Sequence, residues 1–94
     1  MTGSAVIKPS RLDEAIELSL RHVRRSRDEP GCISHAVHQD VEQPNRLVFV
    51  EQWDGLDALR AHFAVPESAA FATELAALSD DTSMAIYDAQ RTRP

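Results

Sequence analysis

The sequence predicts an α+β fold with the element order β-α-β-β-α-β, and three observations support this prediction. Apolar residues recur at helical spacing over residues 11–28, and a run rich in β-branched and aromatic residues spans 46–53. The two halves of the chain, 4–40 and 46–88, repeat the same plan. This order is the split βαβ, or ferredoxin-like, arrangement, in which four strands form one antiparallel sheet. The 94 residues therefore make a single domain, 1–94, with its core in 4–88.

The first half of the chain is predicted to contain a strand, a helix and a second strand. Residues 4–8 are expected to form a short strand, and Ser10 has the character of a helix N-cap. The amphipathic helix over residues 11–28 is expected to end at Pro30, because proline and the glycine after it cannot continue a helix. Residues 32–40 then form the second strand.

The second half begins after a turn over residues 41–45. The third strand, 46–53, shows the clearest strand pattern, and Asp54 is expected to cap the helix that follows it. Pro66 is expected to divide this helix in two, because proline fits the first turn of a helix but disrupts its interior. Residues 82–88 form the last strand, and the remaining residues form a frayed tail.

Composition and charge exclude several classes of function. The net charge is −5, and the ten basic residues are scattered along the chain, so nucleic acid is not an expected partner. No segment approaches the roughly 18 apolar residues that span a bilayer. The single Cys32 excludes an internal disulfide and fits a reducing compartment. We therefore expect a cytoplasmic protein without a membrane partner.

The strands predict a second subunit. Leu47 and Phe49 point to one face of the third strand, whereas Val48 and Val50 point to the other, so both faces of the sheet carry apolar side chains. In the predicted topology the helices cover one face, and a large exposed apolar face usually marks an interface. We expect a homodimer in which the two sheets pack face to face.

The hairpin between the second and third strands suggests a functional site. A register that pairs Val37 with Phe49 also places His35 opposite Glu51 and turns both toward the helices. Ile33 and Trp53 would face each other on the same side of the sheet. Glu51 could then orient His35 as a general base, although the two could equally form a structural cross-strand pair.

The other histidines are weighed separately. His62 follows the apolar stripe of the second helix and could face a cavity or lie at its solvated edge, whereas His22 lies among arginines and is expected at the surface. His35 and His38 should point to opposite faces of a strand, because their separation is odd. With one cysteine and no compact carboxylate–histidine cluster, we expect no metal site. Trp53 could pack in the core or donate its indole N–H to a substrate oxygen.

Taken together, the motifs resemble the antibiotic biosynthesis monooxygenase (ABM) family of the dimeric α+β barrel superfamily. They are Glu29-Pro30-Gly31-Cys32, then Pro44-Asn45-Arg46 leading to Glu51-Gln52-Trp53, and finally the helix from His62 to Phe71. The resemblance covers roughly residues 5–88. It implies a dimer that oxidises a small aromatic substrate, such as a quinol, phenol or anthrone, with O2 and without a metal or flavin cofactor. Haem degradation is disfavoured, because Ala72 stands where the haem-degrading branch has a histidine.

The resemblance and the predicted register together define a set of candidate site residues. The candidate catalytic residues are His35, Glu51, Trp53 and His62, and the candidate substrate-binding residues are Phe49, Phe63 and Phe71. The alternative is a dimer without catalytic activity that binds a small hydrophobic ligand or acts as an accessory subunit, because one fold can serve both roles.

Overall fold

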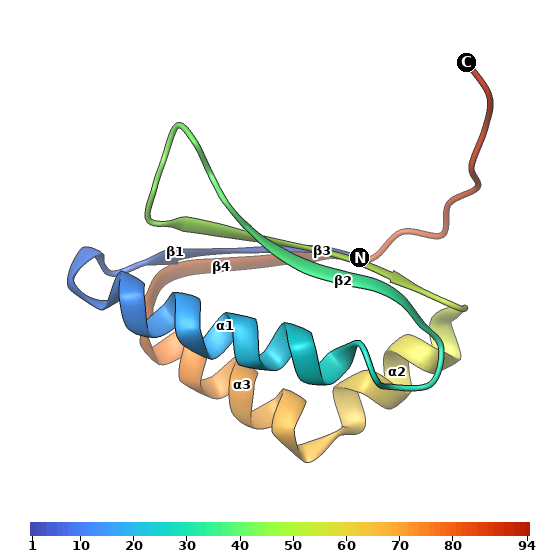
Figure 1. Ribbon diagram of the computed structural model, residues 1–94, viewed down its shortest axis with the longest axis horizontal. Coiled ribbons are helices and arrows are strands. Elements are labelled where there is room, and N and C mark those ends of the chain that lie inside the picture. The colour runs from blue at the N-terminus through green and yellow to red at the C-terminus, as the bar shows by residue number, and fades with distance from the viewer.

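A computed structural model describes all 94 residues and contains the predicted elements in the predicted order. The strands are β1 (Thr2–Ile7), β2 (Cys32–Gln39), β3 (Arg46–Trp53) and β4 (Ser79–Ala85), and the helices are α1 (Leu12–Ser26), α2 (Leu56–Ala64) and α3 (Pro66–Ala77). Every strand pair is antiparallel, and the sheet order is β2-β3-β1-β4. The helices lie on one face of the sheet (Figure 1). The predicted ferredoxin-like α+β fold is confirmed.

The last strand differs from its prediction. It spans Ser79–Ala85 instead of 82–88, and it pairs with β1 along nearly its whole length. The sequence pattern missed its start because Asp80 and Asp81 are residues that strands usually avoid. They are tolerated here because β4 is an edge strand and both side chains are exposed to solvent.

Both predicted helix caps are wrong. Ser10 lies inside a short 3-10 helix over Pro9–Arg11, so α1 begins at Leu12 without a side-chain cap. Asp54 precedes Gly55, which takes the cap position of α2 with a φ of 85°. The main-chain N–H of Asp54 instead donates to the carbonyl of Gly31 at 2.7 Å, which ties the start of β2 to the end of β3.

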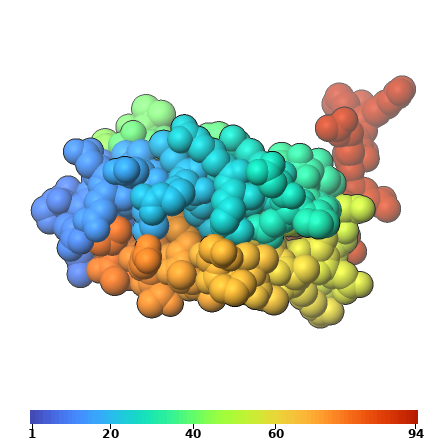
Figure 2. All heavy atoms as spheres, turned by 60° about the horizontal axis from the view of Figure 1, so that its bottom comes forward, coloured from blue at the N-terminus to red at the C-terminus, as the bar shows by residue number.

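The hydrophobic core lies between the sheet and helices α1 and α3, which lie side by side in the space-filling view (Figure 2). Eight buried apolar residues form it: Ala5, Ile7, Ala15, Val23, Leu47, Phe49, Leu75 and Leu78. As predicted, proline breaks the second helix, and Pro66 occupies the first turn of α3. The break lets α2 and α3 take different directions over the sheet (Figure 1).

The register of the β2–β3 hairpin agrees with the prediction over most of its length. Val37 pairs with Phe49, and His35 pairs with Glu51. The prediction is wrong at the open end, where Cys32 pairs with Trp53 and the register shifts between Cys32 and Ser34. This irregularity leaves Ile33 without a partner and 65% exposed.

The outer face of the sheet carries small and β-branched side chains. Val48 is half-buried and Val50 is 41% exposed, and on this face Val50 has Thr2 on β1 and Ala36 on β2 as its neighbours. The single chain leaves this face uncovered, and the homodimer stays a prediction. None of the helices has the length and apolar character needed to cross a membrane.

Candidate active site

A cavity of about 320 Å³ lies between the sheet and the helices. Its volume falls in the range of small-molecule sites, at the lower end. The three candidate substrate-binding residues, Phe49, Phe63 and Phe71, all contribute to its wall, and two candidate catalytic residues, Glu51 and His62, contribute polar atoms. The aromatic rings line the cavity without filling it. A small planar molecule inside it could therefore contact both apolar and polar groups.

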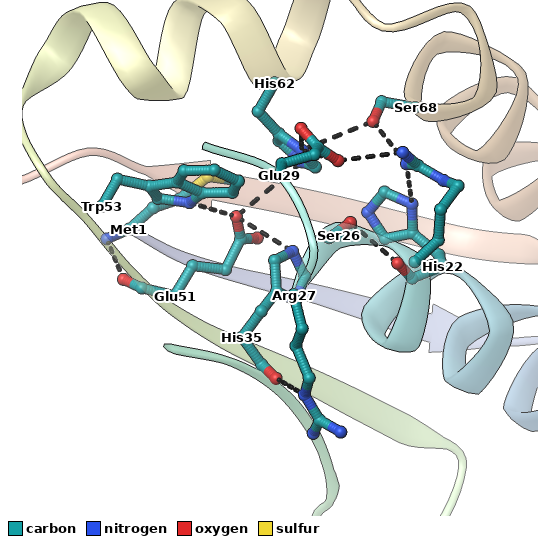
Figure 3. Close-up of polar contacts among 11 residues, drawn as sticks. Met1, His22, Ser26, Arg27, Glu29, His35, Glu51, Trp53, His62 and Ser68 are labelled. Atoms are coloured by element: carbon teal, nitrogen blue, oxygen red, sulfur yellow. Dashed lines mark hydrogen bonds and ion pairs between the residues drawn. The ribbon is translucent and has the colours of Figure 1, made fainter. Parts of the chain in front are cut away.

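Glu51 lies at the centre of a buried polar group, as Figure 3 shows. Its Oε1 accepts a hydrogen bond from Trp53 Nε1 at 3.0 Å and lies 3.2 Å from Nε2 of His35. The carboxylate, the imidazole and the indole therefore meet beneath the helices, as the predicted register requires. The indole N–H has Glu51 as its partner in this structure, and its predicted role as a donor to a substrate oxygen stays a prediction. Trp53 holds the Glu51 carboxylate.

His62 occupies the cavity wall and contacts a carboxylate that the sequence did not suggest. Its Nδ1 lies 3.0 and 3.2 Å from the two carboxylate oxygens of Glu29, in the turn between α1 and β2. An ionised carboxylate can only accept, so Nδ1 of His62 carries the proton and Nε2 of the neutral ring keeps its lone pair. This Nε2 lies 4.0 Å from Oε1 of Glu51. His62 is thus buried at the cavity, not solvated at a helix edge.

His22 was expected at the surface, and that prediction is wrong. It is 7% exposed, and its ring stacks on Phe71 with centroids 3.9 Å apart. Its centroid lies 5.3 Å from those of both His35 and His62. The neighbouring arginines misled the prediction, because they point outward or sideways while position 22 belongs to the buried stripe of α1. His22 also contributes to the cavity wall.

The three histidines form the compact cluster whose absence the sequence analysis assumed. One ring nitrogen from each of His22, His35 and His62 lies within 4.8 Å of the other two. The rings come from α1, β2 and α2, so no spacing along the sequence connects them. His38 is exposed and does not join them.

Arg25 links the buried groups to one another. Its Nη1 donates to Glu29 at 2.9 Å, and its Nη2 donates to Ser68 Oγ at 2.8 Å and approaches Nδ1 of His22 at 3.3 Å. Sequence reasoning missed Glu29, Arg25 and Ser68 as members of the site. The available signal was the Glu29-Pro30-Gly31 motif itself, which was interpreted as a helix stop and as a family motif, without a role for the Glu29 side chain in the site.

Burial and neighbouring charges determine the protonation states of His22 and Glu51. Burial lowers the pKa of His22 to about 3, and the positive charges that His35, His62 and Arg25 can carry act in the same direction. Burial alone would raise the pKa of Glu51, but contacts with His35 and the indole of Trp53 more than offset it and lower that pKa below its usual value. At neutral pH the site therefore holds a neutral His22 beside an ionised Glu51.

Comparison with known proteins shows which protein family the chain resembles. The family model described as antibiotic biosynthesis monooxygenase matches residues 4–74, more than half of the chain. A crystal structure described as an antibiotic biosynthesis monooxygenase superposes with a TM-score of 0.88 and 26% identity, covering 96% of each chain. A structure from Deinococcus radiodurans shares the fold with a TM-score of 0.93 and 24% identity, over 99% of this chain and 93% of that chain.

The chain belongs to the antibiotic biosynthesis monooxygenase family. A curated relative, an uncharacterized protein of Synechocystis sp., is 38% identical over 66 residues, which are 70% of this chain and 45% of that protein. The chain thus spans less than half the length of this relative. The resemblance inferred from the Glu29-Pro30-Gly31 and Glu51-Gln52-Trp53 motifs is confirmed.

Proposed function

We propose that the protein is a cofactor-independent monooxygenase of a small electron-rich aromatic molecule, such as a quinol, phenol or anthrone, with O2 as the oxidant. The observation that carries this proposal is the contact between His62 and Glu29 at the wall of an aromatic cavity. The position of Nε2 of His62, with its free lone pair, suits a base that accepts a hydroxyl proton from a substrate in the cavity.

The reaction balances without an added reductant. For a quinol, His62 removes a hydroxyl proton, and the resulting anion transfers one electron to O2. Recombination of the aromatic radical with superoxide forms a carbon–oxygen bond, and loss of water then leaves a hydroxyquinone. One oxygen atom enters the ring, the other becomes water, and the substrate supplies every electron.

Each polar group has a role in this step. The carboxylate of Glu29 stabilises the positive charge that develops on His62 and fixes the orientation of the ring. The apolar rings of Phe49 and Phe71 exclude water from the substrate anion, which strengthens its electrostatic contacts with the protein. Glu51, held by Trp53, places a negative charge 4.0 Å from Nε2 of His62, which stabilises the protonated ring that forms when His62 accepts the substrate proton.

The test is oxygen uptake by protein without an affinity tag, after treatment with a chelator, over a panel of naphthoquinols, phenols and anthrones. Uptake above the uncatalysed rate is expected with at least one substrate, and His62→Gln should lower kcat by about 10²-fold or more, as expected for loss of a general base. The exposed His38→Gln serves as the matched control and should retain full activity. Absence of uptake across the whole panel contradicts the proposal.

The same panel of substrates distinguishes the proposed monooxygenase from the alternative, a protein that binds a small ligand without catalysis. The chain has one tryptophan, Trp53, whose ring lies 4.6 Å from that of His62 at the cavity wall. Its fluorescence should therefore change when a ligand occupies the cavity. Saturable fluorescence change without oxygen uptake would assign the protein to the class of small-ligand binders.

We also propose that two copies pack through the outer faces of their sheets. The uncovered valines Val48 and Val50 support this arrangement, because a partner sheet would cover them; polar side chains such as Ser4 and His38 share the face with them. In such a dimer each cavity lies on the helical side of its own sheet, away from the interface.

A further inference from the structure

The cluster of His22, His35 and His62 has a property that base catalysis by His62 does not require. The three rings are 7%, 2% and 3% exposed and converge from three different elements. Burying three imidazoles together is costly unless their ring nitrogens find partners. The arrangement therefore calls for a bound group that all three nitrogens can share.

His35 is the ring of the cluster that lacks hydrogen-bond partners. Both of its ring nitrogens are buried, and neither makes a hydrogen bond. Nε2 has the carboxylate Oε1 of Glu51 at 3.2 Å, a contact that helps to lower the pKa of Glu51, whereas Nδ1 has no polar partner. An unsatisfied buried polar group of this kind costs about 1–3 kcal/mol, so its retention at the centre of the cluster points to a ligand.

The groups around the cluster resemble those that support histidine ligands of metals. Histidine ligands usually donate their second ring N–H to a carboxylate or carbonyl, which orients the ring. His62 has this partner in Glu29, at 3.0 Å from Nδ1, and so presents Nε2 toward the cluster. Glu51 places a second carboxylate 3.2 Å from His35 and 4.0 Å from His62. Figure 3 shows Glu29, Glu51 and the three rings together.

Carboxylates and cationic groups both surround the cluster. Three cationic groups lie next to the cluster: Arg25, with Nη2 3.3 Å from Nδ1 of His22, Arg27, whose Nε donates to the carbonyl of His35 at 2.9 Å, and the N-terminal ammonium of Met1, which donates to the carbonyl of Glu51 at 2.8 Å. The charge of Arg25 is paired with Glu29 at 2.9 Å, and the carboxylate of Glu51 adds a second negative charge beside the three rings.

We propose that His22, His35 and His62 bind one divalent transition-metal ion of the type that imidazole prefers, such as Zn²⁺, Co²⁺ or Cu²⁺. A tetrahedral ion with nitrogens at 2.0–2.1 Å needs ligand atoms about 3.4 Å apart. The nitrogens lie within 4.8 Å of one another, so ring rotations that move each by about 1 Å close the site. His22, His62 and Glu51 also line the cavity, so the cluster lies at its wall.

This inference does not rest on the proposed monooxygenase function. A coordinated His62 has no lone pair to accept a proton, so metal binding and base catalysis by this ring exclude each other. Metal loading should therefore suppress oxygen uptake if both proposals hold, whereas metal binding itself can be measured without any substrate.

The test uses the full chain without an affinity tag, stripped with a chelator and titrated with Co²⁺. Saturation at one ion per chain is expected, with the visible ligand-field bands of a low-coordinate Co²⁺ site and quenching of Trp53, whose centroid lies 6.1 Å from that of His35. Zn²⁺ should displace Co²⁺ and abolish both signals. Absence of saturable binding at one equivalent would overturn the proposal.

Three variants assign the ligands. His22→Phe keeps a ring that can stack on Phe71 but removes one ligand. His35→Gln removes the imidazole of His35. Each variant should weaken Co²⁺ binding by more than 100-fold. Glu29→Gln removes the carboxylate behind His62 and should weaken it by 10–100-fold. His38→Gln, on the same strand as His35 but exposed, should bind as the wild type does. Unchanged affinity in folded His22→Phe and His35→Gln, or equal loss in His38→Gln, would overturn the assignment.

A measurement on the unaltered chain covers the case in which a variant fails to fold. Zn²⁺ should shift the imidazole NMR resonances of three histidines and leave those of His38 in place. A shift of His38, or of fewer than three buried rings, contradicts the site.

Discussion

The carboxylate of Glu29 lies 3.0 Å from Nδ1 of His62, although 33 positions separate the two residues in the chain. Glu29 stands in the turn between α1 and β2, and His62 lies on α2. The contact therefore joins the two halves of the fold at the cavity wall. Arg25 approaches the same carboxylate from α1 and limits its freedom to move.

Glu29→Gln is expected to lower kcat for oxygen uptake by about tenfold with little change in KM. The amide keeps the shape of the side chain but cannot stabilise the charge that forms on His62 in the transition state, so the loss falls on kcat. Steady-state oxygen consumption measures both parameters. The exposed Glu74→Gln is the matched control and should leave both unchanged. A rise in KM at constant kcat would show that Glu29 acts on substrate binding.

Gly31→Ala should destabilise the fold by roughly 2–4 kcal/mol, through two separate effects. Gly31 has a φ of 82°, and an added Cβ would lie 2.5 Å from Cβ of Ala58 on α2. Gly55→Ala is the matched control, since Gly55 has a φ of 85° but open space around the added atom. Gly55→Ala should lower the free energy of unfolding by about 1 kcal/mol, because it strains only the backbone. Urea unfolding measures both, and equal losses would show that the contact with Ala58 is relieved at no cost.

The fold was predictable because its elements depend on local patterns. The strand over 46–53 has the same bounds in the structure, and Pro66 begins a new helix as proline in a first turn should. The ends of the elements were less predictable, because they depend on neighbours far away in the sequence. β4 begins at Ser79 because β1 offers it main-chain partners there, which no local preference of Asp80 or Asp81 reveals.

The candidate site was predictable to the same extent: contacts within one hairpin could be inferred from the sequence, whereas contacts between separate elements could not. The contact between His35 and Glu51 follows from the hairpin register, which a short turn constrains, so the sequence could suggest it. Glu29 meets His62 through the packing of separate elements, and no periodicity relates their positions. His22 could have been found from its helix, because positions 15, 19, 22 and 26 follow one another at intervals of four, three and four residues and form one buried stripe.

Val50→Glu should convert the proposed dimer to a monomer at micromolar concentration. Val50 lies on the outer face of the sheet and is 41% exposed, so a charge there is tolerated in a single chain but would be buried between two sheets. Light scattering should give twice the chain mass for the wild type and the chain mass for the variant. Ala69→Glu, exposed on α3, is the control and should stay dimeric. A monomeric wild type would contradict the dimer.

The stability of the protein should fall on mild acidification because His22 is buried in its neutral form. Its pKa is about 3 in the folded chain, against 6.5 for the exposed side chain, so between these values the unfolded chain binds a proton that the folded chain excludes. The free energy of unfolding therefore decreases as pH falls below 6.5, by up to about 1.4 kcal/mol per pH unit from this residue. The groups that face His22 are His35 on β2, Glu51 on β3, His62 on α2 and Arg25 on its own helix.

His22→Phe isolates this contribution, because a phenyl ring can keep the stacking on Phe71 but cannot titrate. The measurement is urea unfolding of both proteins between pH 5 and 6.5, a window above the usual pKa of a carboxyl group, so Glu51, whose pKa is lowered further, does not contribute. The variant should lose less stability per pH unit than the wild type, by up to about 1.4 kcal/mol. Identical slopes would mean that His22 becomes protonated in the folded chain as easily as in water, and the cluster would then open to solvent in solution.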